Sequence, residues 1–273
     1  MEYAYFNDEI IEESSAVFNL NERVLRLGDG FFESIRVENN KAIWAKLHFE
    51  RLVHTAKLVR IILDENFTFH KFESIISLLI SKNKLPHARL RCVLYRKGGG
   101  QYNPIINNAG IFITVEGLGS PKNIIDKVGI FNEVKKNISV YSEIKSCSAF
   151  LYTIASIYAK EQNLDDVLIF NEKNRICETS KSNIFIMKDD SIITPSLSEG
   201  CIGGIIRRVL IDHLQVKEKR ILYEDLKTAD AVFCTNAIGE IQPIFKIDES
   251  CYDLNLVTPL IKKYEALKFK LNA

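Results

Sequence analysis

The stretch GLGSPKNIID, residues 117–126, decides how this chain of 273 residues is organised. Gly117, Gly119, Ser120 and Pro121 crowd into its first half, and such residues favour an irregular connection over a helix or a strand. We therefore predict a first domain at residues 1–118, a linker at 119–127 and a second domain at 128–273.

Before the linker, short apolar runs alternate with turn residues, and one longer segment carries an apolar stripe at helical spacing. We expect strands at 16–20 (AVFNL), 31–37, 42–45 (AIWA), 88–96 and 110–117, with helices at about 46–61 and 71–81. After the linker we expect strands at 128–134, 167–170, 183–187, 191–193 and 231–235, with helices at about 149–162, 204–214 and 259–271. Mixed strands and helices on both sides of one short linker indicate two α/β or α+β domains.

The composition is that of a globular protein, with 47% hydrophobic and 26% charged residues. There are 36 Lys and Arg against 35 Asp and Glu, so no positive excess supports binding to a nucleic-acid backbone. The apolar run at 75–80 is far shorter than the roughly 20 residues of a membrane span. The acidic, mixed start MEYAYFNDEI does not resemble a signal peptide. We therefore expect neither a nucleic-acid nor a membrane partner.

The six cysteines form no C-x-x-C pair, and most of them lie in apolar stretches: Cys92, Cys147, Cys177, Cys201, Cys234 and Cys251. A structural zinc site and a disulfide framework are both unexpected in such a chain. We predict buried thiols, no bound metal and a reducing cytoplasmic location.

Two clusters suit a phosphate. The glycines of GCIGGIIRRVL, residues 200–210, permit a tight turn before a helix whose first N–H groups attract anions. His48, Arg51 and Thr55 share one face of the early helix, where the arginine fork could bind the same group. Each has an ordinary alternative, namely a glycine turn that caps a helix and a solvated helix face.

Two further residues suit covalent chemistry. Lys145, in YSEIKSCSAFLY, precedes an apolar helix among small residues, and burial lowers the pKa of a lysine so that its amine can act as nucleophile or base. Glu178, in RICETSKSNIF, could face a protonated ring nitrogen. The alternatives are a solvated lysine at a helix start and a carboxylate in a surface turn. A buried lysine, a carboxylate and a phosphate cradle together are what pyridoxal 5′-phosphate (PLP) needs from a protein.

With these residues in place, the sequence resembles the class IV aminotransferases, the fold type IV PLP enzymes. Six segments carry the resemblance in order: 27–37, 48–59, the segment around Lys145, 178–187, 194–210 and 235–244. The resemblance implies that Lys145 is the Schiff-base lysine and that Glu178 pairs with the pyridine nitrogen. It also implies that Arg51 and the N–H groups of Ile205 and Ile206 bind the phosphate, with Asn236 and Ala237 in the phosphate-binding turn.

The same resemblance implies two α/β domains joined by a short linker, as in D-amino-acid aminotransferase, and a homodimer. In that family the active site lies between the domains and is closed in part by the second subunit. The resemblance also implies a small amino substrate, with Phe32 among the residues that contact it. Arg36, Arg96 and Tyr102 are our candidates for contacts to a substrate carboxylate because they lie near glycine-rich turns, and the alternative for each is a surface residue at the end of a strand.

Three departures from the family pattern bear on the reaction. Phe32 replaces a tyrosine of D-amino-acid aminotransferases, Phe150 replaces a tyrosine of branched-chain enzymes, and Ala237 replaces the phosphate-binding threonine. With YRKGGGQY at 95–102, they favour the family's lyase of folate synthesis, which converts 4-amino-4-deoxychorismate to 4-aminobenzoate and pyruvate. The alternatives are an aminotransferase for branched-chain or D-amino acids, and a non-catalytic member that serves as a binding or structural subunit.

Overall fold

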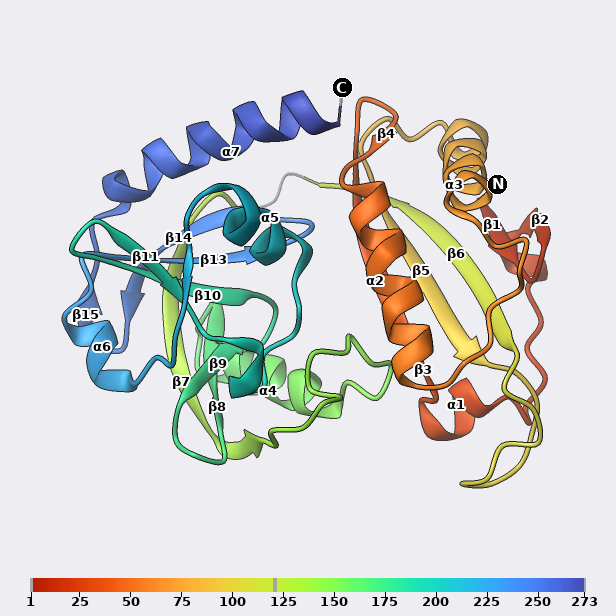
Figure 1. Ribbon diagram of the computed structural model, residues 1–273, viewed down its shortest axis with the longest axis horizontal. Helices are drawn as coiled ribbons and strands as arrows, with labels where there is room; N and C mark the ends of the chain where they lie inside the picture. The colour runs from red at the N-terminus through yellow and green to blue at the C-terminus, as the bar shows by residue number, and fades with distance from the viewer. Residues whose placement is uncertain (1, 120–121, 273) are drawn as a thin grey trace. The chain divides into compact units, whose positions relative to one another are not determined.

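The computed structural model describes residues 2–119 and 122–272, which separate into two compact units (Figure 1). The first unit is Met1–Ser120 with Ile144–Ser148, and the second is Pro121–Glu143 with Ala149–Ala273. Residues 120 and 121 of the expected linker lie outside the described residues, and β7 (Ile125–Lys136) already begins within the remainder of it. The segment that holds Lys145 belongs to the first unit, although the sequence led us to expect it in the second.

The first unit is built on one antiparallel sheet with two helices against it. Its strands, in the order β2-β1-β6-β5-β3-β4, are β2 (Glu9–Glu12), β1 (Tyr3–Phe6), β6 (Ala109–Gly117), β5 (Ala88–Arg96), β3 (Gly30–Glu38) and β4 (Lys41–Ala42). Helices α2 (Ala45–Leu58) and α3 (Phe69–Asn83) cover one face, as Figure 1 shows in orange, and a short α1 (Arg23–Leu27) precedes β3. Leu52 of α2 and Leu79 of α3 share one core with Ile35 and Leu90 of the sheet.

Two expected strands of this unit are wrong. Ala16–Leu20 forms no strand, and Val17 and Leu20 are 80% and 83% exposed, because the hairpin β1–β2 occupies that edge of the sheet. Of AIWA only Ala42 lies in β4, since Trp44 adopts a left-handed conformation (φ 56°) and caps the start of α2.

The second unit contains a mixed sheet of nine strands. Their order is β12-β11-β10-β13-β14-β7-β8-β9, with β15 paired to β14. Three pairs are parallel, namely β14 with β7, β7 with β8, and β11 with β12. Besides β7, the strands are β8 (Asp166–Asn171), β9 (Ile176–Thr179), β10 (Asn183–Lys188), β11 (Ser191–Thr194), β12 (Lys217–Glu218), β13 (Ala231–Asn236), β14 (Glu240–Ile247) and β15 (Ser250–Cys251).

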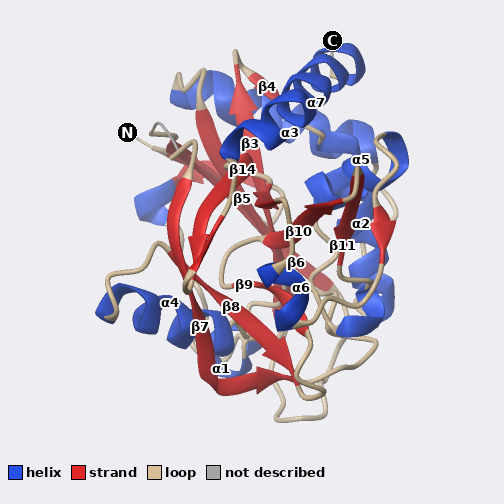
Figure 2. Ribbon diagram, turned by 90° about the vertical axis from the view of Figure 1, so that its left-hand side faces the viewer, coloured by secondary structure: helices blue, strands red, loops and turns tan. Residues whose placement is uncertain are grey.

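Helices pack on this sheet through small and apolar side chains. In α4 (Phe150–Glu161), Ala155 and Ala159 lie against Phe131 of β7 and Val167 of β8, and Figure 2 shows α4 beside these two strands. The others are α5 (Ile205–His213), which packs on β13, α6 (Tyr223–Lys227) and α7 (Thr258–Leu271). Three short 3₁₀ helices lie at Glu13–Ser15, Leu197–Glu199 and Leu254–Val257. The expected helices of both units are confirmed to within a few residues at their ends.

The cysteines agree in part with the expectation that their thiols are buried. All six cysteines are free thiols, and four of them are buried. Cys251 is exposed, contrary to expectation, because it lies in the short outer strand β15.

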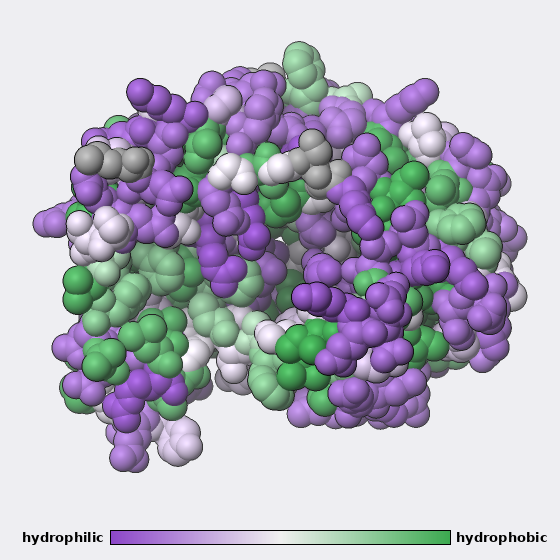
Figure 3. Space-filling model, turned by 180° about the vertical axis from the view of Figure 1, so that it is seen from behind, coloured by the Kyte–Doolittle hydropathy of each residue, from purple (hydrophilic) through white to green (hydrophobic). Residues whose placement is uncertain are grey.

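On the face shown in Figure 3, hydrophobic side chains are interspersed with hydrophilic ones. Within residues 2–119 and 122–272, the helices are too short or too polar for any of them to cross a membrane.

Candidate active site

Lys145 is fixed against strand β3 of the first unit. The Phe32 N–H donates to the Lys145 carbonyl (3.0 Å), and the Cys147 N–H donates to the Gly30 carbonyl (2.9 Å). Its partly buried side chain places Nζ 4.4 Å from the centroid of the Phe32 ring. The backbone of the lysine is therefore held by the sheet, and its amine lies beside an aromatic ring that has no hydroxyl.

A buried carboxylate in β3 organises the polar side chains of α2. Glu33 Oε1 accepts a hydrogen bond from Arg51 Nε (2.7 Å), and Glu33 Oε2 lies 2.6 Å from His48 Nδ1. Burial alone would raise the pKa of Glu33, but the charge of Arg51 and the contact with His48 bring it down to about 2. Burial lowers the pKa of His48. Arg51 is thus held by an ionised carboxylate, and His48 and Thr55 are buried rather than solvated.

The cluster of Glu33, Arg51 and His48 should make the fold less stable as the pH falls. The pKa of Glu33 lies below its ordinary value of 4.5, so its stabilising contribution is complete above pH 4.5 and is lost as the pH falls toward 2. We expect Glu33→Gln, which leaves Arg51 without its anion, to lower the free energy of unfolding at pH 7 by about 3–5 kcal/mol. The difference from the wild type should shrink as the pH falls below 4.5.

Urea unfolding at pH 7 and at a series of acid pH values measures this effect. Glu116→Gln is the matched control, because Glu116 belongs to an exposed ion pair with Arg89, whose loss costs at most about 1 kcal/mol. If Glu33→Gln were as stable as Glu116→Gln at pH 7, the structural role of Glu33 would be refuted.

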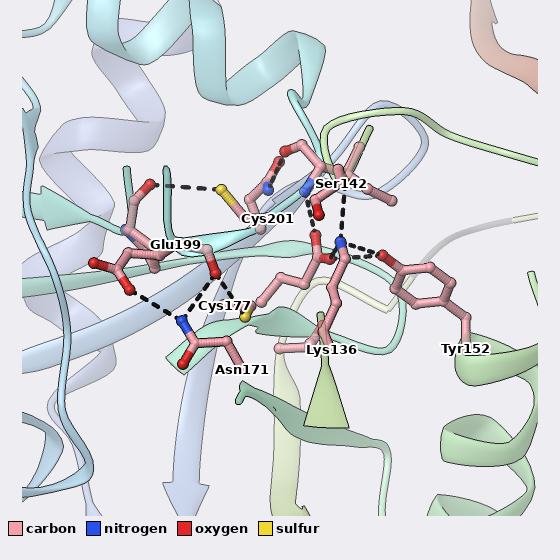
Figure 4. Close-up of polar contacts among 12 residues, drawn as sticks. Lys136, Ser142, Tyr152, Asn171, Cys177, Glu199 and Cys201 are labelled. Carbon is pink, nitrogen blue, oxygen red and sulfur yellow. Dashed lines mark hydrogen bonds and ion pairs between the residues drawn. The ribbon is translucent and has the colours of Figure 1, made fainter. Parts of the chain in front are cut away.

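Glu178, at 2% exposure, lies in β9 of the second unit, and Figure 4 shows Lys136, Ser142 and Tyr152, which belong to the buried hydrogen-bond network around it. Its Oε1 accepts from Lys136 Nζ (2.6 Å) and from the Tyr152 hydroxyl (2.7 Å). Lys136 Nζ also donates to the Tyr152 oxygen (2.6 Å) and to the Ser142 carbonyl (3.1 Å). Burial and the nearby Glu178 charge raise the pKa of Tyr152, which therefore stays a hydrogen-bond donor.

The second carboxylate oxygen of Glu178 retains accepting capacity. Oε2 accepts the N–H of Ile202 (2.9 Å), and a carboxylate oxygen has two accepting positions. Among the described residues no second donor to Oε2 is present. Oε2 could therefore accept a hydrogen bond from a protonated ring nitrogen.

The start of α5 has the features of an anion site. The helix begins after Gly204, and no side chain of the described residues caps its first N–H groups, which include those of Ile205 and Ile206. A Cβ atom at position 204 would lie 2.0 Å from Asn183 Oδ1, so any other residue there would require the Asn183 side chain to shift. Thr235, the register partner of Asn183, has a buried hydroxyl that finds no partner within the described parts of the chain.

The loop that contains Ile202 and Gly203 links the Glu178 carboxylate to the start of α5. The Ile202 N–H donates to Glu178, and the Ile202 carbonyl accepts from Asn183 Nδ2 (2.8 Å). The Gly203 N–H donates to the carbonyl of Glu143 (3.2 Å), two residues before Lys145 in the chain. An uncapped helix start, an orphaned hydroxyl and a carboxylate with spare capacity fit a pyridine ring that bears a phosphate.

The other residues that the sequence singled out lie as follows. Asn236 Oδ1 accepts from the N–H groups of Ile238 and Gly239, so it shapes the turn that contains Ala237. Arg36 pairs with Glu38 (2.6 Å), and buried Arg96 donates to Asp29, to Asn107 and to the carbonyls of Val59 and Arg60. Tyr102 and Phe150 are 91% and 73% exposed. Four further polar residues of the site were not predicted from the sequence, namely Glu33, Lys136, Tyr152 and Thr235.

Comparison with known proteins identifies the family. Residues 30–247 match the model of "Amino-transferase class IV". A putative branched-chain-amino-acid aminotransferase of Methanocaldococcus jannaschii is 27% identical, over 97% of this chain and 94% of its own. A D-alanine aminotransferase of Staphylococcus epidermidis is 26% identical, over 91% and 90%.

Two solved structures show the same fold. The branched-chain aminotransferase of Thermoproteus uzoniensis superposes with a TM-score of 0.89 at 21% identity, over 98% of this chain and 94% of that one. A putative 4-amino-4-deoxychorismate lyase of Legionella pneumophila superposes with a TM-score of 0.84 at 25% identity, over 93% and 96%. With its fold type IV architecture and a family match over most of its length, the chain belongs to the class IV aminotransferases, which are PLP-dependent enzymes.

Proposed function

We propose that this enzyme is a lyase that converts 4-amino-4-deoxychorismate to 4-aminobenzoate and pyruvate. The observation that carries the proposal is the ring beside Lys145. Phe32 offers no hydroxyl to hold a substrate carboxylate where D-amino-acid aminotransferases have a tyrosine. The absence of a tyrosine at Phe150 and the likeness to the Legionella protein, itself named a putative lyase of this kind, add support.

We assign roles to this chain's own residues as follows. Lys145 holds the cofactor through Nζ, and the uncapped start of α5 with Arg51 binds its phosphate. Glu178 Oε2 accepts the hydrogen bond of the ring nitrogen and keeps that nitrogen protonated. When bound, the cofactor supplies an electron-accepting ring that stabilises negative charge on the carbon next to the substrate amine.

The reaction then needs one base and one leaving group. Lys145 Nζ, displaced by the substrate amine, takes the proton from the amine-bearing ring carbon. The bond from the neighbouring ring carbon to the enolpyruvyl oxygen breaks, the carbocycle becomes aromatic, and the departing enolate takes up a proton on its methylene carbon to become pyruvate. No amino acceptor is consumed.

The alternative is an aminotransferase for branched-chain or D-amino acids, which the names of the relatives favour. Both reactions share the removal of the first proton by Lys145, so the site residues above serve either. A non-catalytic role is not supported, because the chain belongs to a family of enzymes and retains Lys145 and Glu178.

The two reactions are separated by a paired assay on the purified protein with PLP. We expect pyruvate and 4-aminobenzoate to form from 4-amino-4-deoxychorismate with no keto acid present. Transfer of an amino group from amino acids to 2-oxoglutarate or pyruvate, without any lyase product, would establish the aminotransferase instead.

We also propose a homodimer in the cytoplasm. Large apolar side chains that are mostly exposed in the first unit, such as Val17, Leu20 and Ile105, support a self-association surface. Six free thiols support a reducing compartment. Sedimentation that gives only the monomer mass would refute the dimer, and recovery of the protein outside the cytoplasmic fraction would refute the location.

A further inference from the structure

The turn between β13 and β14 ends on a residue with a strained backbone. Residues 237–239 join Asn236 to Glu240, which are register partners on the two strands. Glu240 has a left-handed conformation (φ 57°), which disfavours every residue that has a Cβ atom. Glycine is the usual residue in such a conformation, yet Gly239, one position earlier, does not have a positive φ. A glutamate keeps this conformation only where its surroundings hold it there.

Helix α7, drawn in dark blue in Figure 1, holds the side chain of Glu240. Glu240 Oε1 accepts from the Tyr264 hydroxyl (2.8 Å) and from Lys268 Nζ (2.9 Å), and its Oε2 accepts from Lys268 Nζ (3.0 Å). Tyr264 and Lys268 are buried, and with Leu260 they form the inward face of the helix at a spacing of four residues. Burial acts to lower the pKa of Lys268, but Glu240 and Glu265 raise it above its ordinary value, so the amine stays charged at neutral pH. Tyr264 and Lys268 therefore form a clamp on Glu240, called the α7 clamp.

The other end of the turn adjoins the proposed phosphate site. Asn236 Oδ1 accepts the N–H groups of Ile238 (2.9 Å) and Gly239 (2.7 Å), so the turn is bonded to itself at this end. Thr235, one residue earlier, carries the buried hydroxyl for which residues 2–119 and 122–272 supply no partner. Its register partner Asn183 donates to the loop that precedes α5. A change in the turn would therefore displace groups that lie beside the start of α5.

We propose that Glu240 is a positioning residue through which the α7 clamp holds the turn in the conformation that binds the cofactor phosphate. The inference rests on the proposed phosphate site at the start of α5. No member of the clamp has to touch the cofactor, because the contacts with Tyr264 and Lys268 offset the cost of the left-handed backbone at Glu240, and that backbone sets the shape of the turn. The alternative is that the same contacts only attach α7 to the sheet.

The test separates the backbone of Glu240 from its carboxylate. Glu240→Ala and Glu240→Gly both remove the carboxylate from Lys268, but only glycine adopts a left-handed backbone without a steric penalty. The full-length proteins are stripped of cofactor, and absorbance titration gives the dissociation constants of PLP and of pyridoxal, which lacks the phosphate. For Glu240→Ala we expect PLP binding to weaken about 10-fold, the factor by which a Cβ atom disfavours this conformation. Glu240→Gly should lose no more than a few-fold, and pyridoxal binding should change in neither variant.

Substitutions within α7 test the clamp from its other side. Lys268→Met leaves every residue of the turn unchanged but removes the ion pair with Glu240, and it should weaken the binding of PLP but not of pyridoxal. Lys263→Met changes an exposed lysine of the same helix and should bind both compounds as the wild type does. Thermal unfolding should show lower melting temperatures for both Glu240 variants and for Lys268→Met, since all three lose the same contact.

The outcomes distinguish this inference from the proposed function. Equal affinities of Glu240→Ala and Glu240→Gly for PLP, or equal weakening for PLP and pyridoxal, overturn the positioning role and leave the clamp as an attachment of α7. If the wild type prefers PLP to pyridoxal, and Glu240→Ala and Lys268→Met keep the whole of that preference, only the present inference is refuted. If the wild type binds pyridoxal as tightly as PLP, the proposed phosphate site itself is refuted.

Discussion

Replacing Lys145 by alanine is expected to abolish turnover while the protein still binds PLP. The amine at this position is the only one that we assign to both cofactor attachment and proton removal, and general base catalysis alone contributes about 10²–10⁴ to a rate. The phosphate cradle that we propose at the start of α5 belongs to the other unit and should not depend on the lysine side chain. Cofactor binding should therefore become reversible and non-covalent.

Borohydride reduction followed by peptide mass spectrometry measures the attachment directly. In the wild type the cofactor mass should appear on the peptide that contains Lys145, and in Lys145→Ala on no peptide. Lys160→Ala is the control, because Lys160 is an exposed lysine in the last turn of α4 and should leave both label and rate unchanged. Wild-type turnover by Lys145→Ala, or label elsewhere in the wild type, would contradict the assignment.

Local sequence patterns predicted most of the fold because most of its elements are locally determined. The apolar spacing of α3 and the Thr68 side chain that accepts the Lys71 N–H define that helix without reference to the rest of the molecule. Strand β14 was missed because Pro243 interrupts its pattern, although the sheet pairs it on both sides with β13 and β7. The first hairpin was missed although Asn7 and Asp8, both with positive φ, are typical of its tight turn.

The candidate site was harder to predict from the sequence than the fold, because its contacts join residues that are far apart in the chain. Lys136 and Tyr152 lie 42 and 26 positions from Glu178 in the sequence, and no local residue spacing predicts contacts over such separations. Glu33 was within reach of sequence reasoning, because it has the same strand parity as the buried Ile35 and Val37. A carboxylate in line with core residues predicts a buried cation beside it.

Replacing Glu178 by glutamine is expected to lower kcat by at least about 100-fold while PLP stays bound. The carboxamide has no negative charge to hold a proton on the ring nitrogen, and the loss of a hydrogen bond between charged groups accounts for up to about 3 kcal/mol. The change also leaves Lys136, at 8% exposure, without its anion. We therefore expect the melting temperature to fall together with the rate.

A second substitution separates these two effects. Adding Lys136→Met to Glu178→Gln removes the unpaired buried cation, so the melting temperature should recover in the double variant, since a buried ion pair can be replaced by apolar groups at little cost. The rate should not recover, because the ring nitrogen still lacks its carboxylate. Recovery of both would show that Glu178 acts only through stability.

Glu199→Gln is the matched control within the same unit. Glu199 is also a buried carboxylate paired with a cation, since its Oε1 accepts from Arg175 NH1 (2.9 Å), and its Oε2 accepts from Asn171. The same chemical change there should lower the melting temperature without lowering kcat. If Glu178→Gln kept the wild-type kcat, or if Glu199→Gln lost as much rate, the charge at position 178 could not be what holds the proton on the cofactor.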